Sequence, residues 1–246
     1  MLKRVTALAV FLSICSCVLL AQSWYNINES TAADDGTVGW GSCVACAGGG
    51  TTGTVSSAPN QTYPSLDGRS RDFIVSGADY TDGLWWYKVG PHDSDTHFTF
   101  EFWLQVGSGS RFAQALEFDV FQFRSGVEYM FGTQCDYANG VWQLWNAGME
   151  EWVPTQFACK RLTPGKWYHL TYHFHRTVPD NAEHYDSLTI GEQHESTTTY
   201  NFATTYPSGT LPRGFTENMG AQFQIDIGAS GGTIEEWVDE VNFIAN

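Results

Sequence analysis

The chain has 246 residues, and its 27 acidic residues outnumber its 12 basic ones, so its formal net charge at pH 7 is −15. So negative a surface makes nucleic acids and anionic membranes poor partners, and we expect neither. Aromatic residues make up 15% of the sequence and charged residues only 16%. This apolar content excludes a disordered chain and predicts a folded core, so the aromatic residues serve either that core or a ligand.

The first residues have the pattern of a secretory signal peptide. Lys3 and Arg4 precede an apolar run over residues 5–20, and small residues follow that run. We therefore expect residues 1–23 to be removed from a protein that is secreted, to the extracellular space or the periplasm. The apolar run is short and contains serines, which argues against insertion in a membrane. A lipoprotein cleavage box at Cys17 is the alternative for the same segment.

Removal of that segment leaves four cysteines, and exported proteins keep such cysteines oxidised. Four cysteines allow three pairings. We favour Cys43 with Cys46, in a glycine-rich loop that can bend tightly, and Cys135 with Cys159, because both pairings are local in the sequence. The Cys43 and Cys46 spacing also fits half of a zinc knuckle or a redox motif, but no matching second half follows.

The remaining sequence divides into two parts. Residues 24–72 are dominated by Gly, Ser, Thr, Asn and Ala, which predicts an irregular or short-stranded N-terminal segment, tied by its cysteines and packed on the main domain. In residues 73–246, short runs rich in aromatic and β-branched residues alternate with turn residues, which predicts an all-β jelly-roll sandwich of two antiparallel sheets. The expected strands cover residues 73–76, 84–89, 97–106, 114–123, 127–133, 142–146, 167–176, 186–190, 221–228 and 237–245.

The stretch over residues 115–122 alternates apolar and acidic residues. On a β-strand, Leu116 and Phe118 point to one face, while Glu117 and Asp119 point to the other. Two like charges on one face of a sheet are unfavourable unless a metal, a shared proton or hydrogen-bond donors offset them. The acidic pair is therefore the first candidate for chemistry or for binding sugar.

The same alternation gives the other clear strands one apolar and one polar face. In residues 97–106, for example, Phe98, Phe100, Phe102 and Leu104 form the apolar face. We expect the polar faces to line one shallow groove together with the acidic pair. These faces carry Glu101, Trp103 and Gln105; His169, His173 and His175; and Gln222, Gln224 and Asp226.

Two short motifs, at residues 165–170 (Gly-Lys-Trp-Tyr-His-Leu) and 237–241 (Trp-Val-Asp-Glu-Val), resemble signature strands of laminin-G-like domains. These domains belong to the concanavalin A-like lectin and glucanase superfamily. The Leu-Glu-Phe-Asp motif at 116–119 resembles two further branches, the legume-type lectins and the laminarinase-like retaining glycosidases. The motifs at 115–120 and 131–135, with Trp142 and Trp145, also resemble an uncharacterised group of secreted bacterial proteins. The resemblance implies a concanavalin-like sandwich from about residue 98 onward.

The glycosidase branch implies roles for the acidic pair. Glu117 would be the nucleophile and Asp119 its helper, with a general acid at position 121 or 122. These positions hold Phe121 and Gln122, and an amide cannot donate a proton to a leaving sugar oxygen. Hydrolysis needs an acid from another strand, at about 5–5.5 Å for retention or about 6.5–9.5 Å for inversion. The candidates are Glu101, Glu128 and Asp226.

The legume-lectin branch implies a metal instead. A Glu and an Asp two residues apart, as at Glu117 and Asp119, begin the paired calcium and transition-metal site of that family. The later ligands do not follow, because residues 121–124 read Phe-Gln-Phe-Arg. Calcium takes about six to eight oxygen ligands, so two carboxylates alone do not form its site. A structural calcium at an edge of the sandwich stays open, and no other cofactor is expected.

The histidines and tryptophans each allow two interpretations. His169, His173 and His175 could serve a polysaccharide lyase or bind zinc, or they could be half-exposed strand residues bonded to their neighbours. Tryptophans stack on sugar rings, but they also fill cores; those concerned are Trp85, Trp86, Trp103, Trp142 and Trp145. Trp142 and Trp145 cannot share one face of a regular strand, so one of them belongs to the core.

Together these features predict a secreted carbohydrate-binding protein that recognises a polysaccharide or glycan on a polar sheet face. The alternatives are an endo-glucanase-like glycoside hydrolase that uses Glu117 and a structural or adhesive surface protein. The identity of the glycan and the oligomeric state stay open. The expected ligand-binding residues are Glu101, Trp103, Gln105, Glu117, Asp119, Gln122, Trp145, His173, Gln222 and Gln224, with Glu117 and Asp119 catalytic if the protein is an enzyme.

Overall fold

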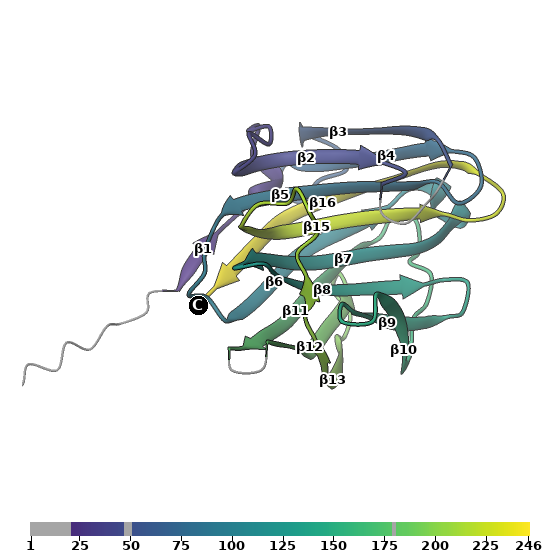
Figure 1. Ribbon diagram of the computed structural model, residues 1–246. Helices are drawn as coiled ribbons and strands as arrows, with labels where there is room; N and C mark the ends of the chain where they lie inside the picture. Colours follow the sequence, from purple (N-terminus) through teal and green to yellow (C-terminus); the bar gives the residue numbers. More distant parts are fainter. Residues whose placement is uncertain (1–20, 47–50, 179–180) are drawn as a thin grey trace, which may run out of the picture.

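The computed structural model describes residues 21–46, 51–178 and 181–246. In these ranges the chain forms two antiparallel β-sheets that pack face to face, with two 3₁₀ helices, η1 (Ile27–Glu29) and η2 (Ser108–Phe112) (Figure 1). The predicted all-β sandwich is therefore confirmed. The predicted signal peptide lies outside the described residues except for residues 21–23, of which the last two begin the first strand.

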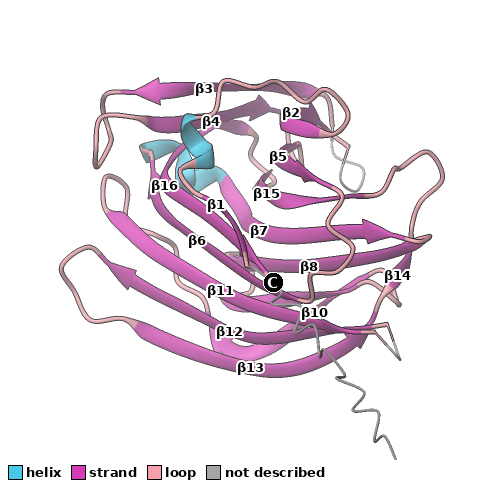
Figure 2. Cartoon of the chain, turned by 90° about the vertical axis from the view of Figure 1, so that its left-hand side faces the viewer, coloured by secondary structure: helices cyan, strands magenta, loops and turns pink. Residues whose placement is uncertain are grey.

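The first sheet, sheet A, has the strand order β13-β12-β11-β6-β16-β4-β3, with β1 beside β16. Figure 2 shows this order from β3 at the top to β13 at the bottom. The strands are β1 (Gln22–Trp24), β3 (Gly53–Gln61), β4 (Ser70–Gly77), β6 (His97–Val106), β11 (Trp167–Thr177), β12 (Ala182–Glu192), β13 (Thr198–Pro207) and β16 (Gly232–Ala245).

The second sheet, sheet B, has the order β10-β9-β8-β7-β15-β5-β2, with β14 beside β8. Its central strand, β7, contains the acidic pair and lies between β15 and β8. The strands are β2 (Val38–Val44), β5 (Asp82–Gly90), β7 (Ala113–Arg124), β8 (Val127–Asp136), β9 (Val141–Asn146), β10 (Glu151–Ala158), β14 (Gly209–Thr210) and β15 (Asn218–Ile227).

The core fills the space between the sheets with aromatic rings. Phe102 of β6 lies 5.2 Å from Phe118 of β7 and 5.0 Å from Phe223 of β15, measured between ring centroids. These side chains are almost completely buried, and burial of each contributes about 1.5–3 kcal/mol to folding. The predicted alternation is thus confirmed, and it turns Glu117 and Asp119 of β7 away from the core.

The N-terminal segment is more regular than predicted. β2 pairs with β5, and β3 pairs with β4, so residues expected to be irregular or short-stranded form strands of 7 and 9 residues that extend both sheets. Trp40 of β2 packs 5.5 Å from the ring of Phe73. The small and polar residues of β2 and β3 hid these strands, because a strand at the edge of a sheet needs few apolar residues. The division at residue 72 stays a prediction.

Both predicted disulfides are confirmed, Cys43 to Cys46 and Cys135 to Cys159. The second bond joins β8 to the residue that follows β10. Trp142, opposite Cys135 in the sheet, is buried in the core, as expected for one of the two tryptophans of β9. Within the part of the chain that the structure describes, no helix has the length and apolar character needed to cross a membrane.

One carboxyl group lies inside the sandwich without a partner. Glu236 of β16 is fully buried and shares the inward face of its strand with Ile234 and Val238. Neither of its carboxyl oxygens has a hydrogen-bond partner among the described residues. Burial raises the pKa of Glu236 to about 8, so this side chain carries a proton at neutral pH.

We predict that Glu236→Gln stabilises the protein at alkaline pH. The folded protein holds a proton that the unfolded chain releases above the ordinary pKa of 4.5, so stability falls as the pH rises from there to about 8. Glutamine has no such proton, and the free energy of unfolding should exceed that of the wild type by roughly 5 kcal/mol at about pH 9. Urea unfolding measures this difference. An equal gain at about pH 4.5 would contradict the assignment.

Candidate functional site

A row of side chains crosses the outer face of sheet B. Gln222 of β15, Asp119 of β7 and Gly132 of β8 lie opposite one another in register. Trp145 of β9 lies against Gly132 and pairs with Trp152 of β10, which continues the row. We call Gln222, Asp119, Gly132, Trp145 and Trp152 the central row. It places an amide and a carboxylate beside two indoles, with a glycine between them.

Gly132 determines the shape of the central row. A Cβ atom at this position would lie 2.7 Å from Cβ of Trp145, 3.1 Å from the ring of Trp152 and 3.5 Å from Oδ1 of Asp119. The two indoles contact each other edge to face, with ring centroids 5.3 Å apart. The missing side chain therefore gives Trp145 the room to lie next to the carboxylate.

A groove of about 460 Å³ lies over the central row. This volume falls in the range of about 300–1,000 Å³ that is typical of small-molecule sites. All five residues of the row line it, together with Glu117 and Gln224 on one side and Glu128 and Met130 on the other. The predicted residues Glu117, Asp119, Trp145, Gln222 and Gln224 are therefore brought together in one depression.

Asp119 is held by two donors. Nε2 of Gln222 donates a hydrogen bond to its Oδ2 at 2.6 Å, and the backbone N–H of Thr133 donates to its Oδ1 at 3.0 Å. Burial raises the pKa of Asp119 to about 7, although both hydrogen bonds favour the ionised form. This carboxyl group therefore changes its charge near neutral pH.

Glu117 behaves differently, because its neighbours are acidic. Burial raises the pKa of Glu117 well above its usual range, and the nearby charges of Asp226 and Asp119 raise it further. Glu117 donates a hydrogen bond to Asp226, which also accepts one from Nε2 of Gln224 at 2.9 Å. Two kinds of hydrogen bond thus offset the cost of placing carboxyl groups side by side. Protonated Glu117 donates one to Asp226, and side-chain amides donate others to the carboxylates.

This geometry bears on hydrolysis. A hydrogen bond joins Asp226 to Glu117, so no sugar bond fits between these two groups. Glu128 pairs with Phe123, six residues along β7 from Glu117, which corresponds to about 20 Å of strand. The side chains of Glu117 and Glu128 are too short to bring their carboxyl groups to the separation of either a retaining or an inverting glycosidase. The third predicted acid, Glu101, belongs to the other sheet.

Four predicted ligand-binding residues lie on the opposite side of the sandwich. Glu101, Trp103 and Gln105 belong to β6, and His173 belongs to β11, both in sheet A. The prediction of one shared groove is therefore wrong. Alternation along a strand predicts which residues face outward, but it does not predict which of the two sheets the strand joins.

The three histidines of β11 share the outer face of sheet A, and each is bonded to a neighbour. The pairs are His169 with Glu101 at 2.8 Å, His173 with Thr99 at 3.1 Å and His175 with Asp186 at 2.9 Å. The structure therefore supports the interpretation as strand residues bonded to their neighbours. Within residues 21–46, 51–178 and 181–246, no group of three or more His, Cys, Asp or Glu side chains has the geometry to hold a metal ion. The structural calcium stays a prediction.

Gln122 lies outside the groove, so its predicted binding role is wrong. It is one residue out of phase with Glu117 and Asp119 on β7, and it is buried. Its Nε2 donates hydrogen bonds to the carbonyl oxygens of His92 at 2.6 Å and Asp95 at 3.1 Å. Gln122 therefore fixes the loop that precedes β6.

Gly132 and Trp152 belong to the site but were not predicted from the sequence. Residues at equal distances from the turn of a hairpin face each other, and Trp145 and Trp152 are so placed around the turn at 147–150. That symmetry is the signal that could have found Trp152. No sequence pattern marks Gly132 in this way, because its role depends on Trp145, which lies on the neighbouring strand.

The fold is similar to those of a lectin-like protein and an alginate lyase of known structure. Arcelin-5, a lectin-like defence protein from Phaseolus vulgaris, is 10% identical over 92% of this chain and 98% of its own, with a TM-score of 0.50. The PL-14 alginate lyase from Aplysia kurodai is 8% identical over 78% of this chain and 87% of its own, with a TM-score of 0.51. No family model and no curated protein matches the sequence. These similarities show a lectin-like jelly-roll fold, consistent with the predicted concanavalin-like sandwich.

We predict that Gly132→Ala strains the central row. The added methyl group would overlap Cβ of Trp145, and such overpacking costs about 1–3 kcal/mol of unfolding free energy. Urea unfolding measures the loss. As a control, the same substitution in a Trp145→Gly background should cost clearly less, since the overlapping atom is gone. Equal losses in both backgrounds would show that Trp145 does not depend on Gly132.

Proposed function

We propose that the protein is exported and binds a carbohydrate chain in the groove on the outer face of sheet B. The observation that carries this proposal is the central row, in which an amide and a carboxylate stand beside two indoles around a glycine. Sugar rings have apolar faces that pack on aromatic rings, and their hydroxyl groups pair with amides and carboxylates. The row offers both kinds of contact within one groove.

Each part of the row has a role in this proposal. Trp145 and Trp152 form the platform for a sugar ring, because they line the groove and contact each other. Asp119 has acceptor capacity left for sugar hydroxyls, since its two hydrogen bonds use only part of its lone pairs. Gln222 and Gln224 hold the carboxyl groups in place and extend the polar side of the groove.

Binding explains the acidic cluster better than hydrolysis does. A nucleophile must be ionised, whereas burial and the hydrogen bond to Asp226 raise the pKa of Glu117 and favour its protonated form. The lectin-like fold is compatible with binding and with cleavage, so the choice depends on the site. Export is supported by the N-terminal sequence and by the two disulfides.

A glycan array combined with reducing-sugar release tests the proposal. Plant and microbial polysaccharides are offered to the wild type and to Glu117→Gln. Binding to a defined glycan without release of sugar is the expected result. Release that Glu117→Gln abolishes would replace the proposal with a glycoside hydrolase, and the absence of both would favour a structural or adhesive protein.

We predict that Trp145→Ala weakens glycan binding about tenfold or more, because it removes half of the aromatic platform. Trp103→Ala is the matched control, since it removes the same side chain from the opposite sheet. Isothermal titration with the best glycan from the array gives both affinities. A loss in Trp103→Ala with none in Trp145→Ala would move the site to sheet A.

We also predict that binding strengthens as the pH rises through about 7, the pKa of Asp119. Below this pH the carboxyl group is protonated and is a weaker acceptor, and above it the carboxylate makes charge-assisted hydrogen bonds to hydroxyls. The affinity should rise roughly threefold to tenfold between about pH 6 and pH 8. Asp119→Asn should remove this dependence. If the variant keeps the same pH profile, another group is responsible.

A further inference from the structure

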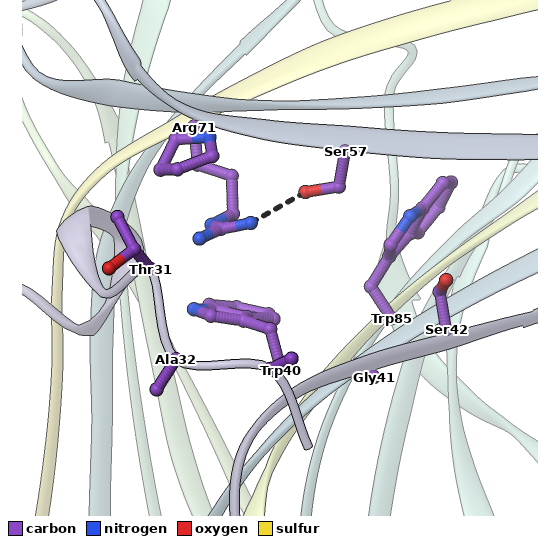
Figure 3. A pocket seen from close by; sticks show the side chains of 10 residues that line it. Thr31, Ala32, Trp40, Gly41, Ser42, Ser57, Arg71 and Trp85 are labelled. Atoms are coloured by element: carbon purple, nitrogen blue, oxygen red, sulfur yellow. Dashed lines mark hydrogen bonds between the residues drawn. The ribbon is translucent and has the colours of Figure 1, made fainter. Parts of the chain in front are cut away.

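A second pocket lies between the two sheets, at the edge formed by β2 and β3. Its volume is about 270 Å³, close to the lower end of the usual range for small-molecule sites. Figure 3 shows Arg71 and Ser57 on one side of it and Trp40, Ser42 and Trp85 around the rest. It shares no lining residue with the groove on sheet B.

Arg71 brings a positive charge into this pocket. Its side chain is only 4% exposed, and its guanidinium group lies 4.5 Å from the ring centre of Trp40. It donates hydrogen bonds to the carbonyl oxygens of Asn28 and Ser30 and to the hydroxyl of Ser57. All three acceptors are neutral. Among the described residues, no carboxylate lies within ion-pair distance of Arg71.

A buried cation without a counter-ion is unfavourable. Burial lowers the pKa of Arg71 to about 10, although the nearby charge of Asp72 raises it, and Arg71 stays protonated at neutral pH. A guanidinium group has five N–H donors, and the hydrogen bonds to Asn28, Ser30 and Ser57 use three of them. The pocket therefore contains both charge and donor capacity that an anion would satisfy.

Trp85 adds a second unsatisfied donor. Its side chain is 1% exposed, and its Nε1 has no hydrogen-bond partner among the described residues. One face of its ring stacks on Phe73, and the side chain borders the pocket across from Arg71 (Figure 3). A buried N–H group without an acceptor is rare in proteins and marks a place where a ligand or water supplies one.

We propose that this pocket binds a small carboxylate on a sugar-sized ring, that is, a uronic acid. Its carboxylate pairs with Arg71 and accepts a hydrogen bond from Nε1–H of Trp85. The ring occupies the remaining space beside Trp40, and its hydroxyl groups exchange hydrogen bonds with Ser42 of β2 and Ser57 of β3. The site is separate from the groove and does not depend on the function proposed for it.

The indole N–H signals of the wild-type protein in ¹⁵N NMR spectra provide the test, with Trp85→Phe identifying the signal of Trp85. D-glucuronate, D-glucose and acetate are titrated separately. The expected result is a saturable shift of the Trp85 signal with glucuronate, no shift with glucose and a shift with acetate only at higher concentration. No shift with glucuronate would overturn the proposal. Equal affinity for acetate would overturn the part that assigns a sugar-sized ring.

Variants then assign the contacts. Arg71→Lys keeps the charge but loses the fork of donors, and it should weaken glucuronate binding about tenfold. Trp85→Phe keeps an aromatic ring but loses the N–H group, and it should weaken binding about fivefold when the indole signal of Trp40 is followed instead. Asp119→Asn, in the groove, should leave glucuronate binding unchanged, which separates the two sites. Unchanged affinity for glucuronate in both pocket variants would contradict the proposal. If Arg71→Lys does not fold, the wild-type titration alone shows whether the pocket binds glucuronate.

Discussion

The hydrogen bond from Glu117 to Asp226 is the interaction on which the candidate site depends. Three carboxyl groups, those of Glu117, Asp119 and Asp226, lie on adjacent central strands of one sheet, where three negative charges would repel one another. Burial and the shared proton keep Glu117 neutral, and amide donors hold the other two. The sheet thereby presents a polar face at its centre without losing the pairing of β7 with β15 and β8.

That arrangement determines what the site offers to a ligand. A neutral Glu117 bonded to Asp226 is poorly suited to attack a sugar, whereas Asp119, with its pKa near 7, is an acceptor placed directly beside Gly132 and the indoles. The site therefore combines hydrogen-bond acceptors with an aromatic surface, and none of the three predicted acids, Glu101, Glu128 and Asp226, is placed to act with Glu117 in hydrolysis. Recognition of a glycan follows from this combination more directly than cleavage does.

The sequence predicted the fold well, because its strands alternate regularly and its core positions are aromatic. Phe102, Phe118 and Tyr172 point inward as the period of two requires. The prediction of the site was poorer for two physical reasons. Alternation does not assign a strand to a sheet, which is why Trp103 and His173 were grouped with Asp119, and the role of Gly132 follows only from a neighbouring strand. The error at Gln122 was avoidable, since alternation along β7 already turns this residue inward, away from Glu117 and Asp119.

The most direct test of sugar binding in the groove on sheet B is a crystal structure of the protein with an oligosaccharide from the glycan that binds best. We expect electron density for a sugar ring against Trp145 and Trp152, with a hydroxyl group within hydrogen-bond distance of Asp119. Density for the sugar on the outer face of sheet A, near Trp103 and the histidines of β11, with an empty groove on sheet B, would contradict it.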